Sequence, residues 1–235
     1  MPLRYEAVDV LPDRLSETLS GLIVERAAGN VTVPHKEHVA SGCDRLTPLA
    51  TRVGAVNTFW VEDGGLAGDN TDVGGFLRLL EVTAPDVDRA RPVVVLGAGG
   101  AAAAVLAALE TAGFRDVNVH ARTASRALAL CERFPGAQVL DAPEALRDAA
   151  LLVNATPVGL DGSDAPVHVD RLAADAVVLD LIPGRDETPL VRAARARGHR
   201  AADGLEMLLA QGALSFERWF GITPDWGAMR ASVAR

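Results

Sequence analysis

The sequence is poor in cysteine, and its cysteines form no recognisable metal site. Cys43 and Cys131 are the only two among 235 residues, and neither stands at the spacing of a ligand set. Free thiols are usual in a reducing cytosol, whereas disulfides are usual outside it. The sequence therefore predicts a cytoplasmic protein with two free thiols and no metal.

Long apolar runs and clusters of basic residues are absent as well. No apolar stretch approaches the roughly 20 residues that a membrane-spanning helix needs, and the opening Met-Pro-Leu-Arg-Tyr lacks the apolar core of a signal peptide. The net charge of −8 argues against a nucleic-acid surface. A hydrophobic content of 49% can still supply packed cores. The composition thus favours a globular protein without membrane or nucleic-acid partners.

Lysine is almost missing. The chain has 23 lysine and arginine residues, and Lys36 is the only lysine among them. Compositional drift could have replaced the others and spared this one by chance. Alternatively, this position needs an amine that can lose its proton, which arginine cannot do because its pKa is too high. The count alone leaves both interpretations open.

Short apolar strands alternate with helices between residues 85 and 205. Glycines follow two of the helices, and Thr188-Pro189 offers an N-cap with proline at the first helical position. Such alternation is typical of a parallel sheet covered on both faces. The expected strands are 93–96, 117–120, 151–153 and 177–179, and the expected helices lie within 97–113, 124–133 and 188–198.

The flanking segments have a different character. Residues 5–10 alternate like a half-buried strand, residues 11–27 fit a helix, and the tail from residue 204 to 235 is helical again. Residues 85–92 are charged and bounded by prolines, which is typical of a linker.

We therefore predict an α/β protein of two domains. One is a mixed α/β domain made of residues 1–84 plus 205–235, and the other is a doubly wound Rossmann domain made of residues 85–204.

A glycine motif opens the first helix of the predicted doubly wound domain. Residues 97–102 match the dinucleotide pattern Gly-x-Gly-x-x-Gly/Ala, with Ala102 in the last place. The pattern follows a strand and precedes a helix, which is the context that pyrophosphate binding requires. A purely structural glycine turn is the alternative. The position of the motif favours a dinucleotide cofactor.

The end of the next strand distinguishes between two cofactors. NAD enzymes usually place an acidic residue there, on the ribose 2′-hydroxyl. This chain instead has Arg122, Thr123 and Arg126, which suit a 2′-phosphate. Solvation of a helix N-terminus by the two arginines is the alternative, but cations are disfavoured at that end of the helix dipole. The residues therefore predict NADP.

Three polar motifs in the first segment hold the candidate reacting groups. They are Asn-Val-Thr-Val-Pro-His-Lys (30–36), Gly-Ala-Val-Asn-Thr (54–58) and Gly-Asp-Asn-Thr-Asp (68–72). The first motif is expected to be a strand end followed by a helix that begins at Pro34. Together they offer an amine, a carboxylate and neutral hydrogen-bonding groups. Oxidation of a secondary alcohol removes the hydroxyl proton as hydride leaves, and a lysine beside a carboxylate can carry that proton. A turn or capping role is the alternative for each residue taken singly.

In order and spacing, seven motifs resemble those of the shikimate dehydrogenase family. They are residues 30–36, 54–58, 70–72 and 97–101, Arg-Thr-x-x-Arg (122–126), Asn-Ala-Thr-Pro-x-Gly (154–159) and Asp-Gly-x-x-Met-Leu-x-x-Gln (203–211). The resemblance runs from about residue 3 to the C-terminus. It implies NADPH-dependent reduction of 3-dehydroshikimate to shikimate in aromatic amino-acid (chorismate) biosynthesis.

The resemblance also implies roles for individual residues. Lys36 and Asp72 would form the catalytic pair, and Thr32, Asn57 and Gln211 would contact the substrate ring, although Gln211 could equally be a solvated helix residue. The residues implied to contact the cofactor are Gly97, Ala98, Gly99, Gly100, Ala101, Arg122, Thr123, Arg126, Ala155, Thr156, Leu181 and Gly204.

The sequence departs from the family pattern in places that bear on the substrate. The family's Ser-x-Ser, which holds the substrate carboxylate, does not occur, and Pro183 replaces a tyrosine. Ala121, His35 and Leu160 are milder departures. We expect a missing first strand-helix unit, or a start codon further upstream, and weak substrate binding by the chain as written. The alternatives are a relative that acts on quinate or another cyclic hydroxy acid, and a catalytically weak NADP-binding protein. Monomer and homodimer both remain open.

Overall fold

The computed structural model describes residues 4–140, 146–184 and 186–233. By its internal contacts the chain divides into two compact units, residues 1–70 and 71–235. Each unit is described by itself. In these described ranges no helix is long and apolar enough to cross a membrane.

The first unit contains a mixed four-stranded sheet in the order β1-β3-β4-β2. The pairs β1/β3 and β3/β4 are antiparallel, whereas β2/β4 is parallel. Its strands are β1 (Gly29–Asn30), β2 (Arg45–Leu46), β3 (Thr58–Glu62) and β4 (Gly65–Asp69). Its helices are η1 (Pro12–Arg14), α1 (Leu15–Val24), α2 (Lys36–Gly42) and α3 (Pro48–Val53).

A tight turn and an apolar helix stripe hold the first unit together. The β3–β4 turn is Asp63-Gly64, with φ of 51° and 79°, which is the conformation that two-residue hairpin turns favour. Leu15, Leu19 and Leu22 recur at helical spacing on α1 and pack against the buried cluster of the sheet. That cluster comprises Val39, Ala40, Ala50, Val56, Phe59 and Leu66.

The second unit contains a six-stranded parallel sheet in the order β10-β9-β8-β5-β6-β7. Counted along the chain from β5, this is the 3-2-1-4-5-6 order of the Rossmann fold. The doubly wound prediction is therefore confirmed. The strands are β5 (Val93–Leu96), β6 (Val117–His120), β7 (Ala137–Val139), β8 (Leu151–Asn154), β9 (Val177–Asp180) and β10 (Arg200–Ala202).

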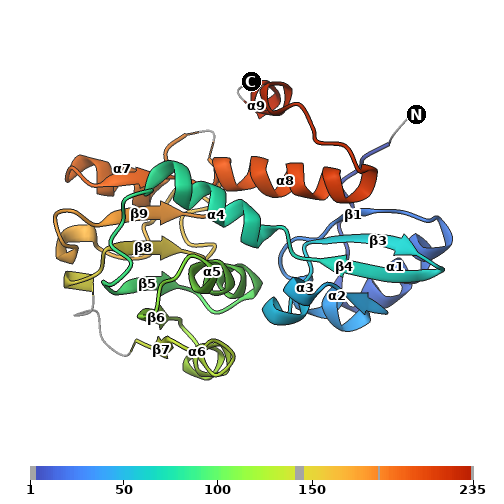
Figure 1. The fold of residues 1–235 in the computed structure, drawn as a ribbon, viewed down its shortest axis with the longest axis horizontal. Coiled ribbons are helices and arrows are strands. Elements are labelled where there is room, and N and C mark those ends of the chain that lie inside the picture. Colours follow the sequence, from blue (N-terminus) through green and yellow to red (C-terminus); the bar gives the residue numbers. More distant parts are fainter. Residues whose placement is uncertain (1–3, 141–145, 185, 234–235) are drawn as a thin grey trace. The chain divides into compact units, whose positions relative to one another are not determined.

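Helices cover the parallel sheet, with α7 beside β9 and β10 and α6 beside β7 (Figure 1). The predicted cap of α7 is confirmed, because the Thr188 hydroxyl accepts the N–H of Val191. The helices of this unit are α4 (Asp72–Thr83), α5 (Gly100–Thr111), α6 (Ala124–Cys131), η3 (Val169–Arg171), α7 (Pro189–Ala196), α8 (Leu205–Phe220) and α9 (Trp226–Val233).

Two local predictions for the first unit are wrong. Residues 5–10 form no strand, because an extended segment becomes a strand only beside a partner, and these residues pair with no strand in the described chain. Two hydrogen bonds hold the segment instead. The Tyr5 hydroxyl donates to the side-chain oxygen of Asn30, and Nε2 of the His35 ring is hydrogen-bonded to the Val10 carbonyl. The helix expected to begin at Pro34 begins at Lys36, since a turn closed by His35 N–H on the Thr32 carbonyl precedes it.

The two compact units group α4 and α8 differently from the predicted domains. Both helices belong to the second unit by contacts, since α4 packs along α8 and against α5. The assignment of residues 1–84 and 205–235 to one substrate domain concerns function and stays a prediction.

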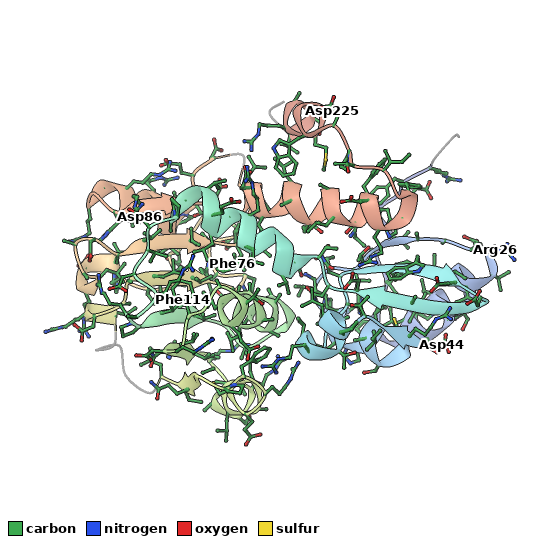
Figure 2. The ribbon with its side chains drawn as sticks, viewed as in Figure 1. Arg26, Asp44, Phe76, Asp86, Phe114 and Asp225 are labelled. Atoms are coloured by element: carbon green, nitrogen blue, oxygen red, sulfur yellow. The ribbon has the colours of Figure 1, made fainter. Side chains whose placement is uncertain are left out.

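Close packing of α4 on α8 depends on one of two adjacent glycines, Gly75, and not on Gly74. A Cβ added to Gly75 would lie 2.8 Å from the carbonyl oxygen of Met207, which is backbone and cannot turn aside. A Cβ added to Gly74 would overlap only the end of the flexible Leu214 side chain. The neighbouring Phe76 is fully buried beneath α4 among the side chains of this unit (Figure 2).

This difference makes two adjacent glycines respond oppositely to alanine. Gly74 and Gly75 lie in the first turn of α4, and replacing a helical glycine by alanine gains up to about 0.8–1.0 kcal/mol of helix stability. We expect Gly74→Ala to keep most of that gain, whereas Gly75→Ala loses about 1–3 kcal/mol through overpacking. Urea unfolding of both variants measures this, and equal stabilities would contradict the packing of α4 on α8.

Candidate active site

The carboxyl ends of three neighbouring strands define the ligand-facing edge of the second unit. Leu96 on β5 pairs with Asn154 on β8, and Asn154 pairs with Asp180 on β9. The chain leaves β5 toward β6 on one side and later returns to β8 on the other. Ligands of open parallel sheets bind at such a point of reversal, outside the strand ends.

The glycine motif lies at this reversal. Gly97 has φ of 112°, and a Cβ there would lie 2.8 Å from the carbonyl oxygen of Ala155, so only glycine fits. Gly99 is the N-cap of α5, and a Cβ added to it would meet nothing within 4 Å. Ala102 is fully buried. The motif therefore combines a tight turn, an open approach to a helix N-terminus and close helix–sheet packing, which fits a dinucleotide pyrophosphate.

The predicted 2′-phosphate residues lie together after β6. Thr123 is the N-cap of α6, and its side chain makes no capping hydrogen bond. Arg122 and Arg126 flank it, and all three side chains are exposed. Two guanidinium groups and a hydroxyl at one exposed helix start can bind a doubly charged phosphate.

Asp180 is a buried acidic residue to which the sequence analysis gave no role. Burial raises the pKa of its carboxyl group, against the lowering effects of the Thr188 hydroxyl, the Ile182 N–H and the Asn154 amide. A raised pKa means that desolvation of the charge outweighs the three hydrogen bonds. The only sequence signal was the Asp-Leu-Ile-Pro motif at residues 180–183.

Leu181 and Gly204, both implied to approach the cofactor, lie next to each other. Gly204 N–H donates to the Ile182 carbonyl at 3.0 Å. A Cβ on Gly204 would overlap the backbone of Leu181. The start of α8 is therefore pressed against the segment that follows β9.

Backbone hydrogen bonds gather the three polar motifs of the first unit. Val56 N–H donates to the Lys36 carbonyl at 2.9 Å, and Val31 N–H donates to the Asn57 carbonyl at 2.8 Å. The third motif joins them, because Asn57 N–H donates to the Asp69 carbonyl at 3.1 Å. Residues 30–36, 54–58 and 68–70 therefore converge within this unit.

These contacts set the surroundings of the candidate substrate residues. Lys36 is half-buried at the first position of α2, Thr32 is exposed on the preceding turn, and Asn57 is 2% exposed. Asn30, the first residue of the 30–36 motif, was given no role of its own from the sequence, but it belongs to the same cluster, since its side-chain amide donates to the Asn57 carbonyl. Asn30 lies in β1, which has only two residues, so the sequence shows no strand periodicity around it.

Asp72 and Gln211 lie in the second unit. Asp72 is the first residue of α4 and is buried. Gln211 lies on α8, where its Cβ is 3.1 Å from the position of a Cβ on Gly75, one turn after Asp72. The two side chains therefore come from facing helices. The structure thus brings Lys36, Thr32 and Asn57 together in one unit, and Asp72 and Gln211 together in the other.

This fold and these residues define a dinucleotide-binding α/β protein with groups suited to proton transfer, as in oxidoreductases. Profiles of three families match the chain: "Shikimate dehydrogenase substrate binding domain" at residues 1–59, "Shikimate / quinate 5-dehydrogenase" at 80–159 and "Shikimate 5'-dehydrogenase C-terminal domain" at 204–234. The shikimate dehydrogenase (NADP⁺) of Mesorhizobium japonicum is 45% identical over 228 residues, which cover 94% of this chain and 81% of that protein. The chain belongs to the shikimate dehydrogenase family.

Solved structures agree with this assignment. Shikimate 5-dehydrogenase from Thermus thermophilus, in complex with NADP(H) and shikimate, is 40% identical with a TM-score of 0.86, over 96% of this chain and 85% of that one. Quinate dehydrogenase from Corynebacterium glutamicum, in complex with NAD, is 33% identical with a TM-score of 0.84, over 93% of this chain and 81% of that one.

Alanine substitutions at two glycines of the motif should separate an effect on stability from an effect on cofactor binding. Gly97→Ala forces a left-handed backbone on alanine and should lower the free energy of unfolding by about 1–3 kcal/mol. Gly99→Ala meets no protein atom and should leave stability unchanged, while its methyl group raises the NADP⁺ dissociation constant roughly 10–100-fold. Thermal unfolding and calorimetry measure the two effects. A Gly99→Ala variant that binds NADP⁺ like the parent would contradict this site.

Proposed function

We propose that this protein interconverts 3-dehydroshikimate and shikimate with NADP(H), in the synthesis of aromatic amino acids. The observation that carries the proposal is the convergence of the chain's only lysine with the Thr32 and Asn57 motifs, in a member of this family whose other unit has a dinucleotide site. Two free thiols support the cytoplasm as the compartment. The proposed state is a monomer or a homodimer.

The reaction needs a proton carrier on the protein. NADP(H), when bound, supplies or accepts the hydride at the ring carbon. Lys36 holds the hydroxyl proton of the substrate at Nζ during oxidation and returns it during reduction. Arginine cannot take this role, since its guanidinium does not release a proton. The presence of a single lysine in a chain whose other basic side chains of this kind are all arginine agrees with that requirement.

The neighbouring residues orient the substrate and compensate the charge of the amine. Asp72 is the proposed carboxylate partner of Lys36 in catalysis. Thr32, Asn57 and Gln211 are proposed to donate to or accept from the ring hydroxyl groups, because each offers a neutral polar side chain that fixes orientation without adding charge.

The cofactor is proposed to lie along the carboxyl edge of the parallel sheet. Its pyrophosphate would contact the turn at Gly97, Ala98, Gly99, Gly100 and Ala101. Its 2′-phosphate would contact Arg122, Thr123 and Arg126, and its nicotinamide half would lie near Ala155, Thr156, Leu181 and Gly204.

Quinate is the second candidate substrate. The likeness to a quinate dehydrogenase and the proline at position 183 both favour testing it. Steady-state oxidation of shikimate and of quinate, each with NADP⁺ and with NAD⁺, decides between them. The proposal predicts the highest kcat/KM for shikimate with NADP⁺. A higher value for quinate would overturn the substrate assignment. Because weak substrate binding is expected, the enzymatic proposal is overturned only if neither substrate is turned over at saturating concentration.

Removal of the Lys36 amine should stop proton transfer without disturbing the cofactor site. We expect Lys36→Ala to lower kcat about 10²–10⁴-fold, the usual contribution of a general acid–base group. The NADP⁺ dissociation constant should stay unchanged, because the glycine motif lies in the other unit. Lys36→Arg, which keeps the positive charge, is the matched control and should be equally impaired. Turnover of either variant within about threefold of the parent at saturating substrate would show that Lys36 is not the proton carrier.

Cofactor choice should depend on the two arginines after β6. Hydrogen bonds to charged groups contribute about 1.5–3 kcal/mol each, so Arg122→Gln with Arg126→Gln should erase a preference for NADPH over NADH of about 10²-fold or more. Fluorescence titration of both cofactors into parent and variant measures the preference. Equal affinities of the parent for NADPH and NADH would mean that these arginines do not contact a 2′-phosphate.

A further inference from the structure

Three buried polar side chains at the carboxyl edge of the parallel sheet are joined by hydrogen bonds. Asn154 ends β8, Asp180 ends β9 and Thr188 caps α7, and they are 0%, 0% and 4% exposed. The Asn154 amide donates to Asp180 Oδ1 at 2.9 Å, and the Thr188 hydroxyl donates to Asp180 Oδ2 at 2.7 Å. A buried carboxylate would be costly without such donors, so the three side chains stabilise one another.

Asn154 shapes the loop that follows β8. Its Oδ1 accepts the Thr156 N–H at 3.0 Å and the Thr156 hydroxyl at 2.7 Å, and its amide also donates to the Val158 carbonyl at 3.2 Å. With the bond to Asp180, both donors and both acceptor directions of the amide are used. The amide therefore has a single orientation, and the loop at residues 155–158 is fixed by it.

Asp180 shapes the loop that follows β9. The same Oδ1 that accepts from Asn154 also accepts the Ile182 N–H at 3.2 Å. The carboxylate thus contacts the loop after β9 and the cap of α7 directly, and the loop after β8 through Asn154. Since Asn154 and Asp180 are paired in the sheet register, the two loops are coupled directly at the strand ends.

Both loops press against glycines that have no room for a side chain. The Ala155 carbonyl faces Gly97, at 2.8 Å from the position of an added Cβ, and the Leu181 backbone faces Gly204. Neither glycine could carry a side chain unless the loop that faces it moved away. The positions of the two loops relative to each other depend on the side chain that joins them.

We infer that Asp180 is a positioning residue for the nicotinamide half of the cofactor. Through Asn154 and Ile182 it holds the loops at residues 155–158 and 181–182 in register, so that their backbone presents one rigid surface. This inference rests on the proposed NADP(H) site. It assigns Asp180 no contact with substrate or cofactor, and it leaves the adenosine half of the cofactor to the residues after β6.

The experiment compares a whole cofactor with a fragment that lacks the nicotinamide half. NADP⁺ and 2′,5′-ADP are titrated by calorimetry into the parent and into Asp180→Asn. The replacement amide turns an N–H toward one of the groups that now donate to the carboxylate. We expect the NADP⁺ dissociation constant to rise roughly tenfold or more, the equivalent of about one hydrogen bond, and the 2′,5′-ADP constant to stay unchanged.

Two further variants keep the test valid if Asp180→Asn folds poorly. Thr188→Val removes the hydroxyl donor and should show the same selective loss, whereas Thr188→Ser keeps the donor and should bind like the parent. Asn118→Ala is the structural control, because Asn118 is a buried polar residue of the same sheet that bonds to Asp116 and Gln138. It should leave both dissociation constants unchanged.

The outcomes are distinguishable. Equal losses for NADP⁺ and 2′,5′-ADP would overturn the positioning role, since they indicate general damage to the unit. Unchanged binding of both by Asp180→Asn and Thr188→Val would overturn it as well. A parent that binds neither ligand would overturn the proposed function, and this inference with it.

Discussion

The close approach of two backbone segments, Gly97 after β5 and Ala155 after β8, is the constraint on which the cofactor half of this protein depends. The Ala155 carbonyl leaves no space for a side chain at position 97. That contact exists because β5 and β8 are adjacent and in register up to Leu96 and Asn154. The glycine allows the chain to turn there, and the turn leads directly into the N-terminus of α5. A sheet order, one glycine and one helix start thus combine into an edge that is suited to binding an anion.

The first unit also depends on backbone contacts between segments that lie far apart in the sequence. It gathers side chains from three loops without a long strand or a large core. Peptide hydrogen bonds do this, because the carbonyl groups of Lys36, Asn57 and Asp69 accept N–H groups from the neighbouring motifs. Asn57 is 2% exposed beside these bonds, so the packing around it restricts the orientation of its side chain.

Much of this arrangement could be predicted from the sequence, and the exceptions have physical reasons. The strand at 93–96 was placed correctly, because central strands of a parallel sheet are continuous apolar runs, and this run ends at Gly97. The two-residue strands β1 and β2 have no periodicity to detect. Residues 5–10 show the right alternation but pair with no strand in the described chain. The link from Asn154 to Asp180 joins residues 26 positions apart, so it needs the strand register, which no local pattern contains.

The central claim is that the dinucleotide is held by the carboxyl edge of the parallel sheet while the substrate is held by the three gathered motifs. Hydrogen–deuterium exchange with NADP⁺ and with shikimate, each added alone, tests it most directly. The account predicts that NADP⁺ slows exchange in the segments 97–102, 122–126 and 154–156, and that shikimate slows exchange in 30–36 and 54–58. Protection by NADP⁺ confined to the first unit, or by shikimate confined to the glycine motif, would contradict the account.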